Sequence, residues 1–123
     1  MTDRADKKSL GRKGEDLACR ALKKERYKIL AKNWRCRLGE IDIVAEDRRK
    51  VLCFIEVKAR SGVGFGLPEE SVTPWKQKRL ISIAYSYIES VKRAEGDLRF
   101  DVAAVDLGTG EVRIIRNAFE EKS

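Results

Sequence analysis

The amino-acid sequence predicts an α/β fold with a mixed central sheet flanked by helices. Two observations lead to this prediction. Five segments have the apolar character of β-strands, and two longer segments repeat their apolar residues every three or four positions, as amphipathic helices do. Short turns connect the first three strand segments, whereas the second helix separates the third from the fourth, which permits those two strands to run parallel. The predicted order is α-β-β-β-α-β-β.

The first helix is expected to begin at Ser9, a residue type that caps helices, and to end near Arg26. The charged residues 1–8 before it are interpreted as a frayed tail, and residues 120–123 as a second tail. The single predicted domain therefore spans residues 9–119. The apolar face of this helix is formed by Leu10, Gly14, Leu17, Ala18, Ala21 and Leu22.

The second helix is expected to begin after Thr73 as its cap, with Pro74 at its first position, and to end near Gly96. Its predicted apolar stripe consists of Leu80, Ile81, Ala84, Ile88 and Val91. The glycine-rich residues 60–72 before it are predicted to form a loop.

Four strands are expected over residues 27–34, 40–47, 51–59 and 98–107, and residues 109–115 close a hairpin with a fifth. The second strand alternates, with Ile41, Ile43 and Ala45 on one face and Glu40, Asp42 and Val44 on the other. The third has the nearly continuous apolar run of a central strand. Residues 117–123 are expected to form one helical turn.

Composition narrows the class of protein. The chain of 123 residues is 42% hydrophobic and 38% charged, which is a globular balance. A net charge of +7 favours a polyanionic partner such as nucleic acid, although a basic surface without a partner is the alternative. The longest apolar-rich run, "LISIAYSYI", is far shorter than the roughly 20 residues that span a bilayer. With no signal-peptide pattern at the start, we expect a cytoplasmic protein that does not associate with membranes.

Cysteine and histidine usage excludes several mechanisms. The three cysteines form no C-x-x-C pair, which argues against a disulfide framework or a zinc ribbon. Cys19 and Cys53 are interpreted as small apolar core residues. The chain has no histidine, so a Ser-His-Asp or Cys-His nucleophile is impossible. Any catalysis must use carboxylates, lysine, tyrosine or a bound metal.

Two acidic residues are predicted to face each other. Alternation places Glu56 and Lys58 on one face of the third strand, and a hairpin centred near residue 49 sets Asp42 opposite Glu56, with Cβ atoms roughly 5 Å apart. Opposed carboxylates repel unless positive charge lies between them, which Lys58 and a divalent cation, Mg²⁺ or Mn²⁺, would supply. Lys58 could then orient or deprotonate an attacking water, or stabilise developing charge. The alternative is a cross-strand salt bridge on a solvated face.

Several motifs carry a resemblance to a known family. "GEIDIVAED" followed by "FIEVKAR" resembles the D-(x)n-E-x-K signature of the PD-(D/E)XK nuclease superfamily. Together with "GRKGEDLACRAL", "NWRCRLGEIDIVAED", "FIEVKARS" and "VTPWKQKRL", it resembles the uncharacterised YraN-like family of bacteria. The resemblance covers the chain from about Gly11 to Phe119.

The resemblance implies a restriction-endonuclease-like fold with an α-β-β-β-α-β core. Asp42, Glu56 and Lys58 would match the catalytic triad, although Ile41 stands where the superfamily signature has proline. Glu15 would match the extra acidic residue that archaeal-type Holliday junction resolvases place beside the metal, so that Glu15, Asp42 and Glu56 form the metal site. Gln77 would match a polar residue near the active site.

Basic residues gather in the sequence around these acidic positions, as a phosphodiester hydrolase needs. Those assigned to nucleic-acid binding are Arg12, Lys13, Arg35, Arg37, Arg60, Lys76, Lys78 and Arg79. Lys23, Lys24, Arg48 and Arg49 are interpreted as surface charges.

The leading hypothesis is a metal-dependent endonuclease acting on DNA more readily than on RNA, on branched or recombination intermediates. A homodimer fits this activity, because cutting two strands takes two active sites. The alternatives are a non-catalytic nucleic-acid-binding protein with the same fold, and a protein–protein adaptor.

Overall fold

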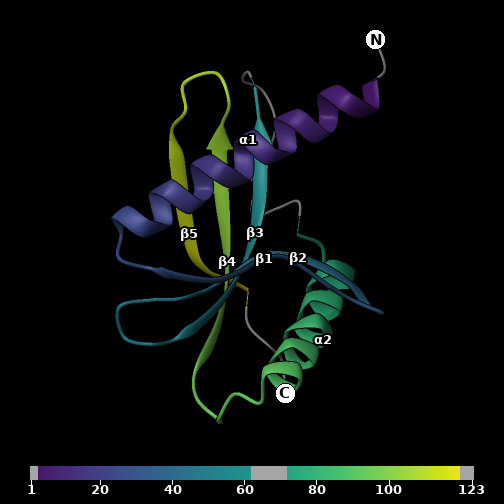
Figure 1. Ribbon diagram of the computed structural model, residues 1–123, viewed down its shortest axis with the longest axis vertical. Helices are drawn as coiled ribbons and strands as arrows, with labels where there is room; N and C mark the ends of the chain where they lie inside the picture. The colour runs from purple at the N-terminus through teal and green to yellow at the C-terminus, as the bar shows by residue number, and fades with distance from the viewer. Residues whose placement is uncertain (1–2, 62–71, 120–123) are drawn as a thin grey trace.

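A computed structural model of the protein describes the structure of residues 3–61 and 72–119 (Figure 1). Five strands form one sheet in the order β1-β2-β3-β4-β5. The strands are β1 (Lys28–Cys36), β2 (Gly39–Glu46), β3 (Leu52–Arg60), β4 (Leu98–Asp106) and β5 (Val112–Phe119). The helices are α1 (Asp3–Lys24) and α2 (Pro74–Val91). The α/β fold and the order of elements agree with the prediction and with a restriction-endonuclease-like architecture.

The sheet is mixed, as the sequence predicts. β1, β2 and β3 pair antiparallel through short turns, and β4 pairs parallel to β3. This parallel pair requires a crossover connection, and α2 lies within it. β5 returns antiparallel beside β4.

Each helix covers one face of the sheet. On the α2 side the core is aromatic, with Phe54 stacked on Phe100 at 5.7 Å between ring centroids and Phe100 stacked on Phe119 at 4.7 Å. On the α1 side it is built from smaller residues, including the predicted core cysteines Cys19 and Cys53. No helix in the described ranges is long and apolar enough to cross a membrane.

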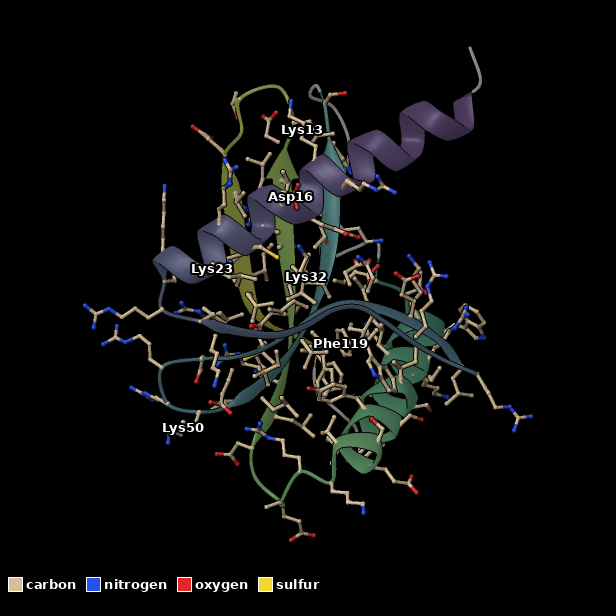
Figure 2. All side chains as sticks on the ribbon, viewed as in Figure 1. Lys13, Asp16, Lys23, Lys32, Lys50 and Phe119 are labelled. Atoms are coloured by element: carbon tan, nitrogen blue, oxygen red, sulfur yellow. The ribbon has the colours of Figure 1, made fainter. Side chains whose placement is uncertain are left out.

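Helix α1 approaches β3 closely at Gly14. A Cβ atom added to this glycine would lie 2.7 Å from the Cβ of Ala59. Only glycine therefore permits this packing distance, and the neighbouring Glu15 is carried toward the sheet. The ion pair between Lys32 and Asp16, with 3.8 Å between nitrogen and oxygen, ties β1 to the same helix (Figure 2).

Both helices differ from the predicted boundaries. α1 begins at Asp3 rather than at Ser9, because four of residues 3–8 are arginine, alanine or lysine, which favour a helix. α2 begins as predicted, with the Thr73 side chain accepting a hydrogen bond from the Lys76 backbone nitrogen, but it ends at Val91. Lys92 adopts the left-handed conformation there, with φ 54°, and stops the helix before Gly96.

Three further expectations need correction. Val91 is exposed, and Ile83 and Tyr87 join the buried face of α2 instead. Ile41 packs on the α2 side with Phe54, not on the α1 side, so the alternation along β2 breaks near Asp42. β5 extends to Phe119 where a helical turn was expected, because Phe119 pairs with Phe100 in the sheet. Most of the predicted loop 60–72, and the tail 120–123, lie outside the described residues.

Candidate active site

The acidic pair lies where β2 and β3 stop pairing. Their ladder follows the predicted register and ends at Ile43 opposite Ile55, so Asp42 and Glu56 come directly after the last pair. Beyond this point the Val57 backbone nitrogen donates a hydrogen bond to Asp42 Oδ2 at 2.8 Å. The carboxylate of Asp42 thus occupies a place that a backbone carbonyl would have in a continuing ladder, and it is fixed in orientation.

The electrostatic environment of Asp42 is unfavourable for a lone negative charge. Burial first, and then the nearby carboxylate of Glu56, raise the pKa of Asp42 to about 7, with smaller contributions from Glu15 and Glu40. The hydrogen bond from Val57 acts in the opposite direction. The carboxylates of Asp42 and Glu56 therefore lie close together, with the charge of Glu15 on α1 acting on them from farther away, and a positive charge placed beside the pair would be favoured.

Two lysines stand beside these carboxylates. Lys58 Nζ lies 3.6 Å from Glu56 Oε1, and both side chains are less than one-fifth exposed. Lys76 at the start of α2 is close enough to Lys58 that contact with this amine, followed by burial, lowers the pKa of Lys76. The fields of Glu56 and Asp42 also reach Lys76. The sequence predicts that Lys76 binds nucleic acid, and the fold sets its side chain beside Lys58 at the edge of the acidic centre.

Glu15 is held near the centre by a residue that the sequence analysis missed. The Asn33 side-chain nitrogen donates to Glu15 Oε2 at 3.0 Å. Asn33 lies in β1 with φ 52°, a left-handed conformation that asparagine tolerates better than most residues. No sequence motif signals this role, because the contact joins two elements 18 residues apart.

Gln77 has a local structural contact. Its side-chain nitrogen donates to the Val72 backbone oxygen at 2.9 Å, just before the first turn of α2. This bond steadies the entry of the chain into α2 and hence the position of Lys76. The interactions formed by the described residues do not join Gln77 to Asp42 or Glu56.

The carboxylates of the acidic centre supply only part of the coordination that a divalent cation needs. Within residues 3–61 and 72–119, no three carboxylate or cysteine side chains lie close enough together to form a complete metal site, so Glu15, Asp42 and Glu56 are not drawn into one such set. Mg²⁺ needs only one or two carboxylates, because waters and substrate phosphate complete its coordination. Asp42 and Glu56 each have one oxygen, Oδ1 and Oε2, that makes no hydrogen bond or ion pair with the described residues. These two carboxylates are the ones that would hold the ion.

The predicted basic residues fall into two groups. Arg60 forms the first group: together with Lys58 it lines one shallow cavity of about 290 Å³ over β3, β4 and β5, and together with Glu15 it lines another of about 340 Å³. Apart from Lys76, the others lie at the surface, where Arg35 pairs with Glu40 at 3.2 Å and Arg79 donates to the Leu38 backbone oxygen at 2.8 Å. Arg12, Lys13, Arg37 and Lys78 are exposed.

The fold and the acidic centre define a protein of the PD-(D/E)XK-like superfamily. The sequence profile of "Uncharacterised protein family UPF0102" matches residues 14–105, and the chain belongs to this YraN-like family. It is 41% identical to a UPF0102 protein of Geotalea uraniireducens, with 96% of this chain and 94% of that one aligned. It is 51% identical to a UPF0102 protein of Chlorobium limicola, over 81% and 77% of the two chains.

Among solved structures, SfsA of Pyrococcus furiosus in complex with Ca²⁺ matches with a TM-score of 0.33 and 12% identity. The match covers 94% of this chain and 65% of that chain. A similarity of this size establishes neither a shared fold nor a shared activity.

Proposed function

We propose that this protein is a metal-dependent endonuclease that hydrolyses phosphodiester bonds in DNA. The observation that carries the proposal is the convergence of Asp42 and Glu56 at the end of the β2–β3 ladder, where the pKa of Asp42 is raised to about 7 and Lys58 adjoins Glu56. Crowded carboxylates cost stability, and such a cost is typical of catalytic sites rather than structural ones.

The residues of the chain have separable roles in this reaction. A bound Mg²⁺ would neutralise phosphate charge and lower the pKa of an attacking water. Asp42, oriented by the Val57 backbone, and Glu56 would hold that ion. Lys58 would orient the water or hold its proton, and Lys76 would stabilise charge on the phosphate oxygens. Glu15, held by Asn33, would orient a second water.

DNA is the proposed substrate because of charge and exposure. The chain carries a net charge of +7, and exposed basic residues lie on α1 and α2 on both sides of the acidic centre. Trp75 at the start of α2 is 68% exposed beneath the guanidinium of Arg79, at 5.3 Å from the ring centroid. An exposed aromatic ring of this kind stacks on an unpaired base, which favours branched DNA over continuous duplex. Two copies of the chain would supply two active centres for two strands.

The first test is cleavage of labelled single-stranded, duplex, flap and four-way-junction DNA with Mg²⁺ and with Mn²⁺. We expect cleavage by the wild type and a loss of at least about a hundredfold in Asp42→Asn, which keeps the acceptor for Val57 but not the charge. The matched control is Asp97→Asn, an exposed acid before β4, which should cleave like the wild type. The same substrates made of RNA test whether the protein cleaves DNA in preference to RNA.

A nucleic-acid-binding protein without catalysis is the second candidate. It is favoured by one observation, that the described residues assemble two rather than three candidate metal ligands. Calorimetric titration with Mn²⁺ separates the two candidates. The nuclease requires binding that Asp42→Asn abolishes, whereas DNA binding with neither Mn²⁺ binding nor cleavage would establish the second candidate.

A further inference from the structure

A second concentration of basic side chains lies at the other end of the strands. The last turn of α1, the turn between β2 and β3, the start of β4 and the end of β5 surround a hollow of about 730 Å³. In Figure 2 this region lies at the left, between the labelled Lys23 at the end of α1 and Lys50 in the β2–β3 turn. Six cationic side chains line it: Lys24, Arg26, Arg48, Arg49, Arg99 and Arg116.

The floor of this basic hollow is a fixed hydrogen-bonded network. Arg99 donates from Nε to Asp101 Oδ1 and from Nη1 to Asp47 Oδ2, both at 2.9 Å. It also donates from Nη2 to the Tyr27 hydroxyl at 2.8 Å, and Arg116 donates to the same hydroxyl at 3.0 Å. Asp101 is 1% exposed. The floor is therefore rigid, and its charges are largely paired with one another.

The rim of the basic hollow is different. Lys24, Arg26, Arg48 and Arg49 form no ion pair with the described residues. The six cations outnumber the carboxylates of Glu25 and Asp47 on the lining and of Asp101 beneath it. Three of these rim residues, Lys24, Arg48 and Arg49, have the sequence pattern of surface charges, but the fold brings them together from α1 and from the β2–β3 turn. An excess of unpaired guanidinium groups over a rigid base suits the oxygens of a phosphate.

Arg26 reaches this rim through a backbone conformation that costs energy. It follows α1 with φ 67°, and the Tyr27 nitrogen donates to the Leu22 oxygen at 2.9 Å, the pattern of a helix stop that glycine usually makes. Glycine would make the same turn without strain but would supply no charge. The presence of arginine instead of glycine at this position indicates selection for the contacts of its side chain rather than for the turn itself.

We propose that the basic hollow binds a backbone phosphate of the nucleic acid on which the acidic centre acts; the inference rests on the proposed function. Glu15 on α1 and Glu25, the residue directly after its end, are ten residues apart, or about 15 Å at the helical rise. Asp42 and Asp47 are five residues apart along β2 and the turn that follows it, or about 17 Å. One strand of B-DNA advances about 3.4 Å per nucleotide, so the bound phosphate lies roughly four to five nucleotides from the bond that is cut.

A matched pair of variants tests the site. Arg26→Gly and Lys92→Gly each remove one positive charge and relieve one left-handed residue at the end of a helix, but only Arg26 lines the basic hollow. Both variants should melt at or above the wild-type temperature. Binding of labelled four-way-junction and duplex DNA is measured by fluorescence anisotropy without divalent cations, so that no cleavage occurs. We expect Arg26→Gly to bind about five- to tenfold more weakly, and Lys92→Gly within about twofold of the wild type.

A second variant and a length series complete the test. Arg48→Gln/Arg49→Gln, in an exposed turn, should weaken binding as Arg26→Gly does. The wild type should gain affinity when a duplex is lengthened past the predicted phosphate, and Arg26→Gly should lose that gain. Equal affinities of Arg26→Gly and Lys92→Gly, or no DNA binding by the wild type, would overturn the inference.

Free phosphate is the other source of the same chemistry. If inorganic phosphate or a mononucleotide binds the wild type but not Arg26→Gly, while both bind DNA equally, the inference about backbone phosphate is wrong. Because affinity is measured without metal, a failure of catalysis is seen separately, in the cleavage assay with Mg²⁺.

Discussion

At the scale of single residues, Asp42 links the chemistry of the centre to the stability of the protein. Its pKa in the folded protein, about 7, is well above the ordinary value of 3.8. Between these values the folded state holds a proton that the unfolded state has released. The free energy of unfolding therefore falls as the pH rises from about 4 to 7, because the folded state must then ionise Asp42 beside Glu56.

Asp42→Asn removes this penalty. Without divalent cations, we expect the variant to be more stable than the wild type by about 1–3 kcal/mol at pH 8, and the difference to shrink toward pH 4.5. Urea unfolding at pH 4.5, 6 and 8 measures it. Asp97→Asn, which changes an exposed acid outside the acidic centre, is measured alongside as the control variant. Parallel curves for Asp42→Asn and the wild type would show that Asp42 ionises without cost.

Metal binding should depend on the ionisation of the same carboxyl group. An ion among these carboxylates requires ionised Asp42, so its affinity should rise as the pH increases toward 7 and level off above it. Isothermal titration with Mn²⁺ in buffers of different ionisation enthalpy counts the proton released at pH 6, and we expect a substantial fraction of one proton. No proton release at pH 6 would place the ion elsewhere.

At the scale of elements, the packing of α1 on β3 positions Glu15. The helix lies so close that a Cβ on Gly14 would meet Ala59 at 2.7 Å, a separation that real Cβ atoms do not adopt. The closeness is needed at one point of the helix only, since an added Cβ on Gly11 would have nothing within 4 Å. Substituting the two glycines of α1 therefore distinguishes the effect of helix propensity from the effect of tertiary packing.

Gly14→Ala is expected to destabilise the protein by about 1–3 kcal/mol, because α1 must move away from the sheet. Gly11→Ala should stabilise it by about 0.5–1 kcal/mol through helix propensity alone. Urea denaturation measures both changes, and the cleavage assay should show a loss for Gly14→Ala only. If Gly14→Ala is as stable as Gly11→Ala, the close contact does not position α1.

At the scale of the whole molecule, the charge of +7 is distributed over exposed side chains around a partly buried acidic centre. Nucleic-acid binding should therefore depend steeply on salt, since each phosphate that a basic side chain neutralises releases counterions. The exposed residues Arg12 and Lys78 flank the centre, whereas Arg20 and Lys92 lie outside the proposed DNA-binding surface.

Arg12→Gln/Lys78→Gln should lower the slope of log affinity against log salt by about 0.7–0.9 for each phosphate that is no longer neutralised. Arg20→Gln/Lys92→Gln has the same charge and should keep the wild-type slope. Anisotropy titrations over a range of KCl concentrations give the slopes. An equal reduction in both double variants would mean that net charge alone, and not the arrangement around the centre, governs binding.

Sequence periodicity alone determined the α/β class, the order of elements, the register that sets Asp42 beside Glu56, and the face that carries Lys58. These features are local, because strand alternation and short turns place residues relative to near neighbours along the chain. The tertiary structure decided what depends on distant segments meeting: Asn33 holding Glu15, Lys76 lying at the edge of the acidic centre, and the basic hollow assembled from α1, the β2–β3 turn, β4 and β5. It also decided where α2 stops, because Lys92 takes a left-handed conformation that composition does not reveal. Contacts across the fold follow from packing, and packing is not encoded in any one stretch of the chain.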